Sequence, residues 1–226
     1  MRAGILPEPD DGIGRRVQAR SLGKQRLLRK LKTICGIVIA LVIGWFVFAS
    51  VNIYNPHQGD LEARADAVVS LSPPPYRLPL AEELYASDHA AHLVISYVPI
   101  NPRDATPEWI GAWEPAKRYC EDQTPGVDEN ISCFTPEEIS TRGEAHAIRE
   151  VAERESWDSI TVVTSRHHIF RTRFILQQCI GDAVDVNVVF PEPDLFIEKT
   201  QESWGTYLLY ENLAFFKAVY ETTLGC

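Results

Sequence analysis

The sequence lacks the short motifs that identify the commonest enzyme classes. It has no Gly-x-Ser-x-Gly nucleophile elbow, no Gly-x-Gly-x-x-Gly dinucleotide fingerprint and no phosphate-binding P-loop. It also lacks a His-Glu-x-x-His zinc motif: His89 and His92 form an HxxH pair, but no further ligand completes a site for them. We therefore expect no metal, and the sequence names no cofactor.

Basic residues are scarce beyond the first 32 positions. Residues 55–226 contain 13 Lys and Arg against 28 Asp and Glu, a net charge of −15. Nonspecific binding to nucleic acid needs a basic footprint, so a nucleic-acid partner is not expected. An anionic substrate is not excluded, because a few arginines near the site, and not the net charge of the domain, would determine whether an anion binds. Residues 1–32 differ, with nine basic and three acidic side chains.

One apolar run is long enough to cross a membrane. Residues 33–54 (TICGIVIALVIGWFVFASVNIY) contain no charge in 22 positions, and a helix of that length spans the ~30 Å hydrocarbon core. Aromatic residues near its end and the absence of an Ala-x-Ala site favour an uncleaved anchor, with cleavage near Ala49-Ser50 as the alternative. The basic residues before it predict a cytoplasmic tail (1–32) and an outer domain, in a single-pass protein of the cell membrane. The tail either binds membrane lipid of the inner leaflet or serves only as a topology signal.

The cysteines agree with an outer location. Cys35 lies in the apolar run, and the other four lie where disulfides persist. Of the three possible pairings we favour Cys120–Cys133, which closes a short loop, and Cys179–Cys226, which ties the C-terminus to a helix end. Free thiols are the alternative.

After a polar stalk at 55–64, strand-like and helix-like segments alternate through residues 65–226. The expected strands are 67–71, 92–98, 131–134, 159–164 and 184–190, and the expected helices are 78–85, 141–155, 167–180 and 203–222. Continuous Val/Ile runs between helices predict a mainly parallel sheet covered on both faces, a Rossmann-like, doubly wound α/β sandwich of three layers. Residues 99–130 are expected to be a long, partly irregular insertion. Ligands in such folds bind beyond the carboxyl ends of the strands.

The most informative of these strand ends is Thr164-Ser165-Arg166-His167-His168-Ile169-Phe170-Arg171. Ser165 is expected to cap the following helix, and His168 and Arg171 are three residues apart, so they share a helical face. A hydroxyl, backbone N–H groups, an imidazole and a guanidinium would then meet at a helix N-terminus. That combination suits a phosphate or carboxylate. The alternative is that Ser165 only caps and the arginine pairs with a local acid.

Two further stretches precede helices. Thr141-x-x-Glu144 has the pattern of a capping box, and simple helix initiation is its favoured interpretation. Glu144 would instead orient His168 or act as a base if its carboxylate faced the same crevice. At the first strand end, Ser70 is followed by a proline-rich turn and by Arg77, which is placed to close over a ligand.

Together these stretches resemble the YdcF/SanA/ElyC-like family of bacterial domains over about residues 65–215. Residues 65–71 and 93–96 are similar to its first two strands, and Ser140-Thr141 with Glu144 is similar to its helix start. Thr164-Ser165, His168 and Arg171 match its most specific element, TSxxHxxR, and Glu211 falls near an acid of its last helix.

The chain departs from the family at two loops. The family's glycine-rich first loop is here Ser72-Pro73-Pro74-Pro75, and its Ser-Gly-Gly after the second strand is Ser96-Tyr97-Val98. Glycine lets backbone approach a ligand, whereas proline stiffens a turn and removes an N–H donor. Ligand binding at these two loops is therefore expected to be altered or lost.

The resemblance implies an envelope role, such as handling of cell-wall precursors or maintenance of envelope integrity, and gives no reaction. Our leading hypothesis is that Arg171 and Arg77 hold a phosphorylated or lipid-linked anion, Ser165 adds a donor, and His168 with Glu144 handles a proton. A noncatalytic envelope scaffold with a degenerate ligand site is the alternative. A cofactor-dependent transferase is suggested by the fold alone, and fold does not imply function.

Overall fold

The computed structural model describes residues 12–101, 103, 105–121, 128–193 and 203–226. The chain divides into two compact units, Met1–Phe48 and Ala49–Cys226. The second unit contains the whole α/β fold and the last turn and a half of the first helix.

Helix α1 runs from Gly12 to Tyr54 without a break. Its segment Arg29–Tyr54 has a mean hydropathy of 2.7 and is, by length and composition, a candidate membrane span. This segment begins four residues before the predicted 33–54. The helix continues through the basic tail because Arg, Lys, Leu and Gln are good helix formers, so the charge boundary is not a helix boundary.

The second unit is built on five parallel strands, which confirms the predicted sheet. They are β1 (Ala65–Ser70), β2 (Ala90–Ser96), β3 (Ile131–Phe134), β4 (Ser159–Val163) and β5 (Asp185–Val189), in the order β3-β2-β1-β4-β5. In the centre of the sheet Val69 is paired with Val94 on one side and with Val162 on the other. Such runs of Val and Ile are buried on both faces, as parallel sheets require.

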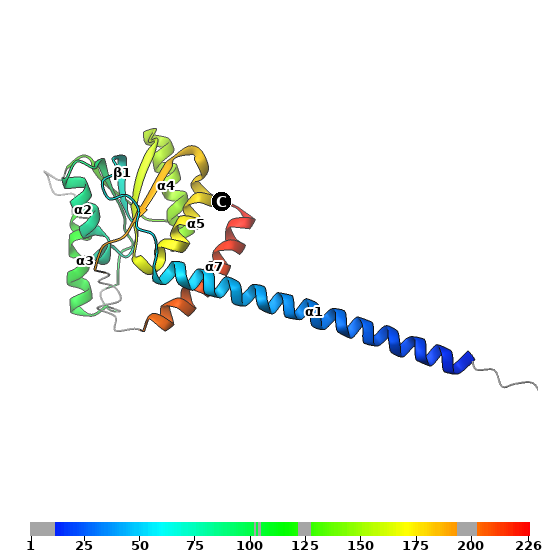
Figure 1. The fold of residues 1–226 in the computed structure, drawn as a ribbon. Helices are drawn as coiled ribbons and strands as arrows, with labels where there is room; N and C mark the ends of the chain where they lie inside the picture. Colours follow the sequence, from blue (N-terminus) through cyan, green and yellow to red (C-terminus); the bar gives the residue numbers. More distant parts are fainter. Residues whose placement is uncertain (1–11, 102, 104, 122–127, 194–202) are drawn as a thin grey trace, which may run out of the picture. The chain divides into compact units, whose positions relative to one another are not determined.

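Helices cover both faces of the sheet, as Figure 1 shows. Helices α2 (Leu78–Ala86) and α3 (Pro107–Cys120) cover one face, and α4 (Thr141–Glu155) and α5 (Ile169–Ile180) cover the other. Helix α7 (Trp204–Leu224) packs against α5, where the ring of Phe215 lies 5.0 Å from that of Phe170. Alternate residues of β1 enter two separate cores, Val68 on the α2 side and Val69 on the α4 side. The fold is therefore the predicted doubly wound sandwich.

The insertion expected at 99–130 contains a regular helix, α3, which was not among the predicted helices. Thr106 caps α3 by accepting a hydrogen bond from the Trp109 N–H, and Pro107 occupies the first turn. Trp113 and Ala116 are buried against the sheet. The Thr-Pro start was a usable signal, but Pro115 inside the helix and the surrounding acids and glycine concealed it.

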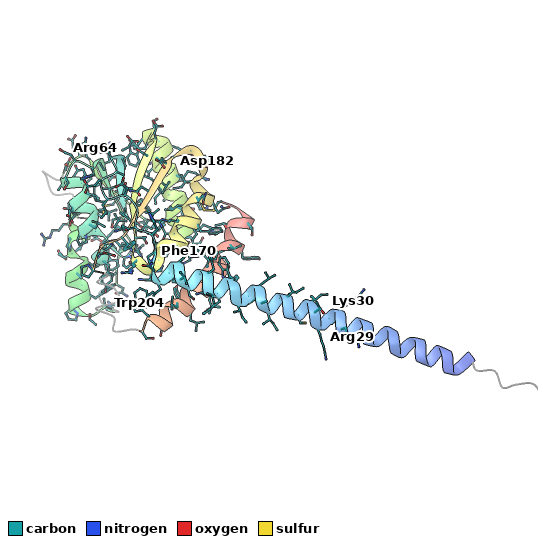
Figure 2. The ribbon with its side chains drawn as sticks, in the orientation of Figure 1. Arg29, Lys30, Arg64, Phe170, Asp182 and Trp204 are labelled. Carbon is teal, nitrogen blue, oxygen red and sulfur yellow. A yellow bond between two sulfur atoms is a disulfide. The ribbon has the colours of Figure 1, made fainter. Side chains whose placement is uncertain are left out.

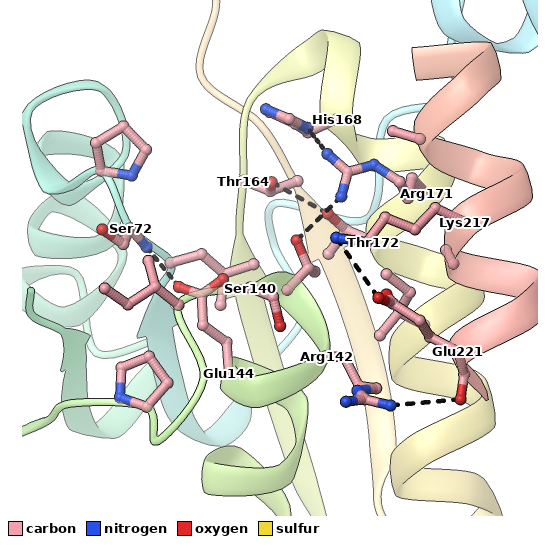
Figure 3. A pocket seen from close by; sticks show the side chains of 18 of the residues that line it. Ser72, Ser140, Arg142, Glu144, Thr164, His168, Arg171, Thr172, Lys217 and Glu221 are labelled. Carbon is pink, nitrogen blue, oxygen red and sulfur yellow. Dashed lines mark hydrogen bonds and ion pairs between the residues drawn. The ribbon is translucent and has the colours of Figure 1, made fainter. Parts of the chain in front are cut away.

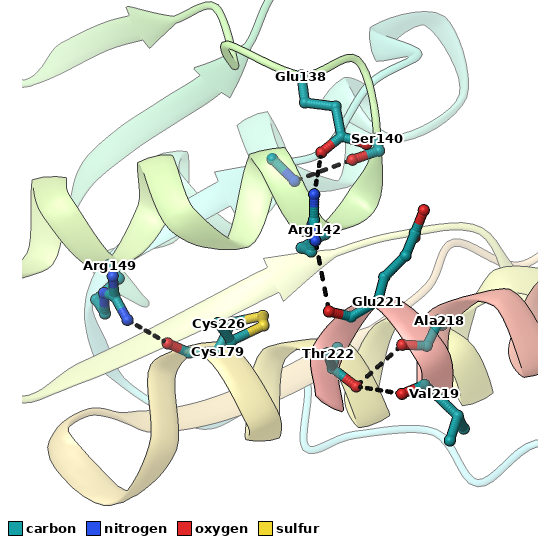
Figure 4. The surroundings of a disulfide bond; sticks show 11 residues. Glu138, Ser140, Arg142, Arg149, Cys179, Ala218, Val219, Glu221, Thr222 and Cys226 are labelled. Carbon is teal, nitrogen blue, oxygen red and sulfur yellow. Dashed lines mark hydrogen bonds and ion pairs between the residues drawn. A yellow bond between two sulfur atoms is a disulfide. The ribbon is translucent and has the colours of Figure 1, made fainter. Parts of the chain in front are cut away.

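Both favoured cysteine pairings are confirmed. The sulfurs of Cys120 and Cys133 lie 1.96 Å apart and join the end of α3 to β3. Those of Cys179 and Cys226 lie 1.94 Å apart and join α5 to the C-terminus (Figure 4). Cys35, in α1, is a free thiol.

In doubly wound sheets, ligands bind beyond the carboxyl ends of the strands at the point where the strand order reverses. Here that point lies between β1 and β4, because β2 and β3 lie on one side of β1 while β4 and β5 lie on the other. Arg64 and Asp182 mark the amino-terminal edge, and Phe170 and Trp204 lie toward the opposite edge (Figure 2).

Candidate functional site

A pocket of about 360 Å³ lies at the carboxyl ends of β1 and β4, between α4, α5 and α7 (Figure 3). Six of the eight residues predicted to bind or react line it: Arg77, Thr141, Glu144, Thr164, His168 and Arg171. Pro73 and Pro136 also line the pocket without filling it. The proline-rich first turn has therefore not closed the site.

His168, Arg171 and Glu211 form one hydrogen-bonded cluster. Glu211 comes from α7 and is 1 % exposed. Its carboxylate accepts two bonds from Arg171, 2.9 Å from Nε and 3.2 Å from a terminal nitrogen, and its Oε1 lies 2.9 Å from His168 Nδ1. Arg171 also lies 2.7 Å from the same His168 Nδ1 and donates to Thr141 Oγ1 at 3.4 Å. Because Nδ1 is occupied, Nε2 is the imidazole nitrogen left to meet a ligand.

The cluster fixes the charges of its members. Burial lowers the pKa of His168 to about 4, against the opposing pull of the Glu211 carboxylate, so the imidazole is neutral at pH 7. Burial by itself raises the pKa of Glu211, but the charges of His168 and Arg171 and their hydrogen bonds outweigh it and hold that pKa at about 2. Arg171, 14 % exposed, is thus a charged group kept in place by a charged partner.

Glu144 lies across the pocket and contacts the first loop. Its Oε1 accepts a hydrogen bond from the Ser72 N–H at 2.7 Å, and the side chain is buried. Burial raises the pKa of Glu144, and the charge of Arg77, the Ser96 hydroxyl and the Ser72 N–H oppose that rise. A carboxyl with a raised pKa and an imidazole with a lowered pKa in one pocket is an arrangement that suits general acid–base chemistry.

Neither Thr141 nor Ser165 caps a helix as the sequence predicted. Ser140, and not Thr141, caps α4 by accepting from the Gly143 N–H at 3.1 Å, which leaves Glu144 free of the predicted capping box. Ser165 makes no capping bond and does not line the pocket; its Oγ accepts from Arg77 Nε at 3.1 Å. The expectation that Ser165 caps a helix was therefore wrong, because the buried guanidinium of Arg77 takes its hydroxyl.

The remaining predicted residues support the walls. Thr164, at the end of β4, pairs its hydroxyl with that of Thr172 at 3.3 Å. Ser70, at the end of β1, is fully buried and does not line the pocket, and its hydroxyl has no hydrogen-bond partner among the described residues. Arg77 also donates to the carbonyl of Ser72, which ties α2 to the first loop.

Sequence reasoning did not include two basic side chains of the pocket wall. Arg142 lies 2.7 Å from Glu138 and donates to the Glu221 carbonyl at 3.4 Å, and Lys217 lies 3.5 Å from the Glu221 carboxylate. Lys217 and Glu221 are four residues apart on α7, a surface pattern with no functional signal of its own. The sequence also gave Glu211 only as a weak match to the family, although Glu211 is the carboxylate that contacts His168.

No group in this pocket has the composition of a metal site among the described residues. Elsewhere in the described residues one cluster of possible metal ligands is found, His146, Cys179 and Cys226; it does not line the pocket, and two of its members are disulfide-bonded. Comparison of the chain with family models, with curated proteins and with solved structures finds no match.

Proposed function

We propose that this chain is a membrane-anchored cell-envelope protein whose outer domain binds a phosphorylated, anionic group in the pocket at the ends of β1 and β4. One observation carries the proposal. The pocket wall contains four basic side chains (Arg77, Arg142, Arg171 and Lys217) against two carboxyl groups, in a domain that has 13 basic and 28 acidic residues. So strong a local reversal of charge is what an anion site needs.

The chemistry follows from the arrangement of these groups. Arg171 and Arg77 are rigid cations, and Lys217, on the exposed rim, approaches a ligand from α7. His168 offers Nε2 as a neutral base or hydrogen-bond donor, while Glu211 and Arg171 hold its other nitrogen. Glu144 supplies a carboxyl that burial keeps closer to its protonated form. The pocket thus supports proton transfer beside a bound anion.

The anchor and the tail support the location. With nine basic residues before the apolar segment, the N-terminus stays in the cytoplasm and the domain with its two disulfides faces outward. The resemblance to the YdcF/SanA/ElyC-like family supports a role in cell-wall precursor handling or envelope integrity. A lipid-linked phosphate is then the substrate class that the membrane offers to such a site.

Binding is tested on the full-length protein in lipid nanodiscs, with inorganic phosphate and pyrophosphate as probes. Lys217→Ala removes a charge-assisted contact and is expected to weaken binding about tenfold, since such a contact contributes about 1.5 kcal/mol. Arg154→Ala is the matched control, because Arg154 pairs with Glu155 on the surface of α4 and does not line the pocket. Equal affinities for all three proteins would reject the anion site.

Catalysis is tested in cells. His168→Gln is expected to reproduce the envelope phenotype of a deletion at normal protein level, because the basic imidazole is lost while the fold remains. A noncatalytic scaffold is the rival, and one observation favours it: Arg171 is already neutralised by Glu211. If His168→Gln behaves as wild type while a deletion within 99–130 does not, the scaffold is the better account.

A further inference from the structure

Helix α7 carries an exposed apolar face in addition to the faces that line the core and the pocket. Its outward residues Leu209, Leu213 and Tyr220 are 54, 62 and 65 % exposed, and Phe216 is half exposed. These positions repeat at intervals of four, three and four residues, so they form a single stripe along the helix. Of the 21 residues of α7 only Glu211, Lys217 and Glu221 are charged, and none lies on this stripe.

The same helix is fastened to the end of α1 within the second unit. Asn212 Nδ2 donates to Ser50 Oγ at 3.3 Å, and the Trp204 ring lies 5.2 Å from that of Tyr54. Arg166 donates to the Tyr54 carbonyl at 3.3 Å and so caps the C-terminus of α1 with a cation. Ala49 and Ile53 are fully or almost fully buried. The last six residues of α1, Ala49–Tyr54, thus belong to the second unit.

That attachment sets the depth of α7. The candidate span ends at Tyr54, and Ser50 lies four residues inside it, or ~6 Å at the rise of a helix. A side chain hydrogen-bonded to Ser50 therefore lies at the level of the outer membrane boundary. Leu209 and Leu213 flank Asn212, and an amphipathic helix buries its apolar side ~5–10 Å into that boundary.

We propose that the stripe Leu209–Leu213–Phe216–Tyr220 is a membrane-interface surface, so that α7 lies in the headgroup region of the outer leaflet. The neighbouring face of α7 forms a wall of the pocket through Tyr210, Ala214 and Lys217. The pocket consequently opens beside the lipid surface. This inference depends on the membrane anchor of the proposed function and does not depend on anion binding.

Spin labels measure the depth of this surface in the full-length protein. Single cysteines replace Leu213, Tyr220, Val51 or Asp182 in a Cys35→Ser background with the native disulfides intact, and the protein is reconstituted in phosphatidylethanolamine–phosphatidylglycerol vesicles. Val51 is 60 % exposed within the candidate span, and Asp182 is an exposed site at the amino-terminal edge of the sheet. Collisions with oxygen report lipid, and collisions with a water-soluble nickel chelate report water.

We expect the oxygen-to-nickel ratio at Leu213 and Tyr220 to exceed that at Asp182 several-fold and to approach that at Val51. A ratio at Leu213 equal to that at Asp182, with Val51 in lipid, overturns this inference and leaves the anchor standing. Low collision rates with both reagents, together with spin–spin broadening that vanishes on dilution with unlabelled protein, would assign the stripe to a second copy of the chain instead. A water-like ratio at Val51 overturns the anchor as well.

Discussion

Replacing Glu211 by Gln isolates the ion pair that organises the pocket. Glutamine has nearly the same shape and keeps one oxygen for Arg171, but it loses the charge that faces Arg171 and His168. Glu211 is 1 % exposed and makes three short polar contacts. Removing one partner of a buried pair costs about 3–5 kcal/mol, because the other charge stays buried without compensation. Since the amide keeps part of the hydrogen bonding, we expect a loss of about 3 kcal/mol.

The assay is denaturant unfolding of the full-length protein in micelles, followed by tryptophan fluorescence. Glu155→Gln is the matched control: its carboxylate lies 2.9 Å from Arg154, but both side chains are about half exposed or more. Surface pairs contribute about 0–1 kcal/mol, so this variant should unfold almost as wild type does. If Glu211→Gln loses no more unfolding free energy than Glu155→Gln, the pair does not hold the site together.

A second measurement separates the charge effect from a packing effect. Because the Glu211 carboxylate raises the pKa of His168, which burial has lowered to about 4, its removal should lower that pKa further. Nuclear magnetic resonance of the imidazole gives the titration directly. An unchanged or higher pKa of His168 in Glu211→Gln would contradict the contact between the two side chains.

Two further predictions concern pH and backbone space. The pKa of His168 is about 4 in the folded protein and near 6.5 in the unfolded chain, so as the pH falls the unfolded chain binds a proton first. The contribution of His168 to the free energy of unfolding is therefore complete above pH 6.5 and is lost between pH 6.5 and 4. Unfolding curves at several pH values should show wild type losing about 3 kcal/mol more than His168→Gln across that window. A Cβ on Gly143 would lie 2.1 Å from the Glu138 carbonyl oxygen, whereas one on Gly111 would meet nothing within 4 Å. Thermal melts should therefore show Gly143→Ala strongly destabilised and Gly111→Ala unchanged or more stable by up to ~1 kcal/mol.

The fold was predictable because its signals are local. Runs such as Val68-Val69 and Val162-Val163 are buried on both faces, and no helix period competes with them over so short a length. The covered parallel sheet follows from the helices between these runs. Helix α3 was missed although Trp109, Trp113 and Ala116 have helical spacing, because Pro115 lies inside it and a proline usually ends a helix.

The site was only partly predictable because its bonds join distant residues. The rule that ligands bind beyond the carboxyl ends of the strands predicted Thr164, His168 and Arg171 as site residues, and all three line the pocket. The rule needs no knowledge of their hydrogen-bond partners. The partners themselves come from elsewhere: Ser165 is taken by Arg77, 88 residues earlier, and Arg171 by Glu211, 40 residues later. No local pattern reports such pairs, so a hydroxyl before a helix was assigned the usual role of a cap.

Helix α7 connects the three parts of the proposed mechanism. Its buried face carries Glu211, which holds His168 and Arg171, and its next face carries Lys217 into the pocket wall. Its exposed face carries the stripe centred on Leu213, and Asn212 ties it to the end of α1. If α7 lies in the headgroup region as proposed, it cannot shift against the lipid without moving the Glu211 carboxylate, which contacts the imidazole of His168. The proposed depth of α7 is then coupled to the geometry of the pocket, and a ligand that is itself held in the membrane would contact both.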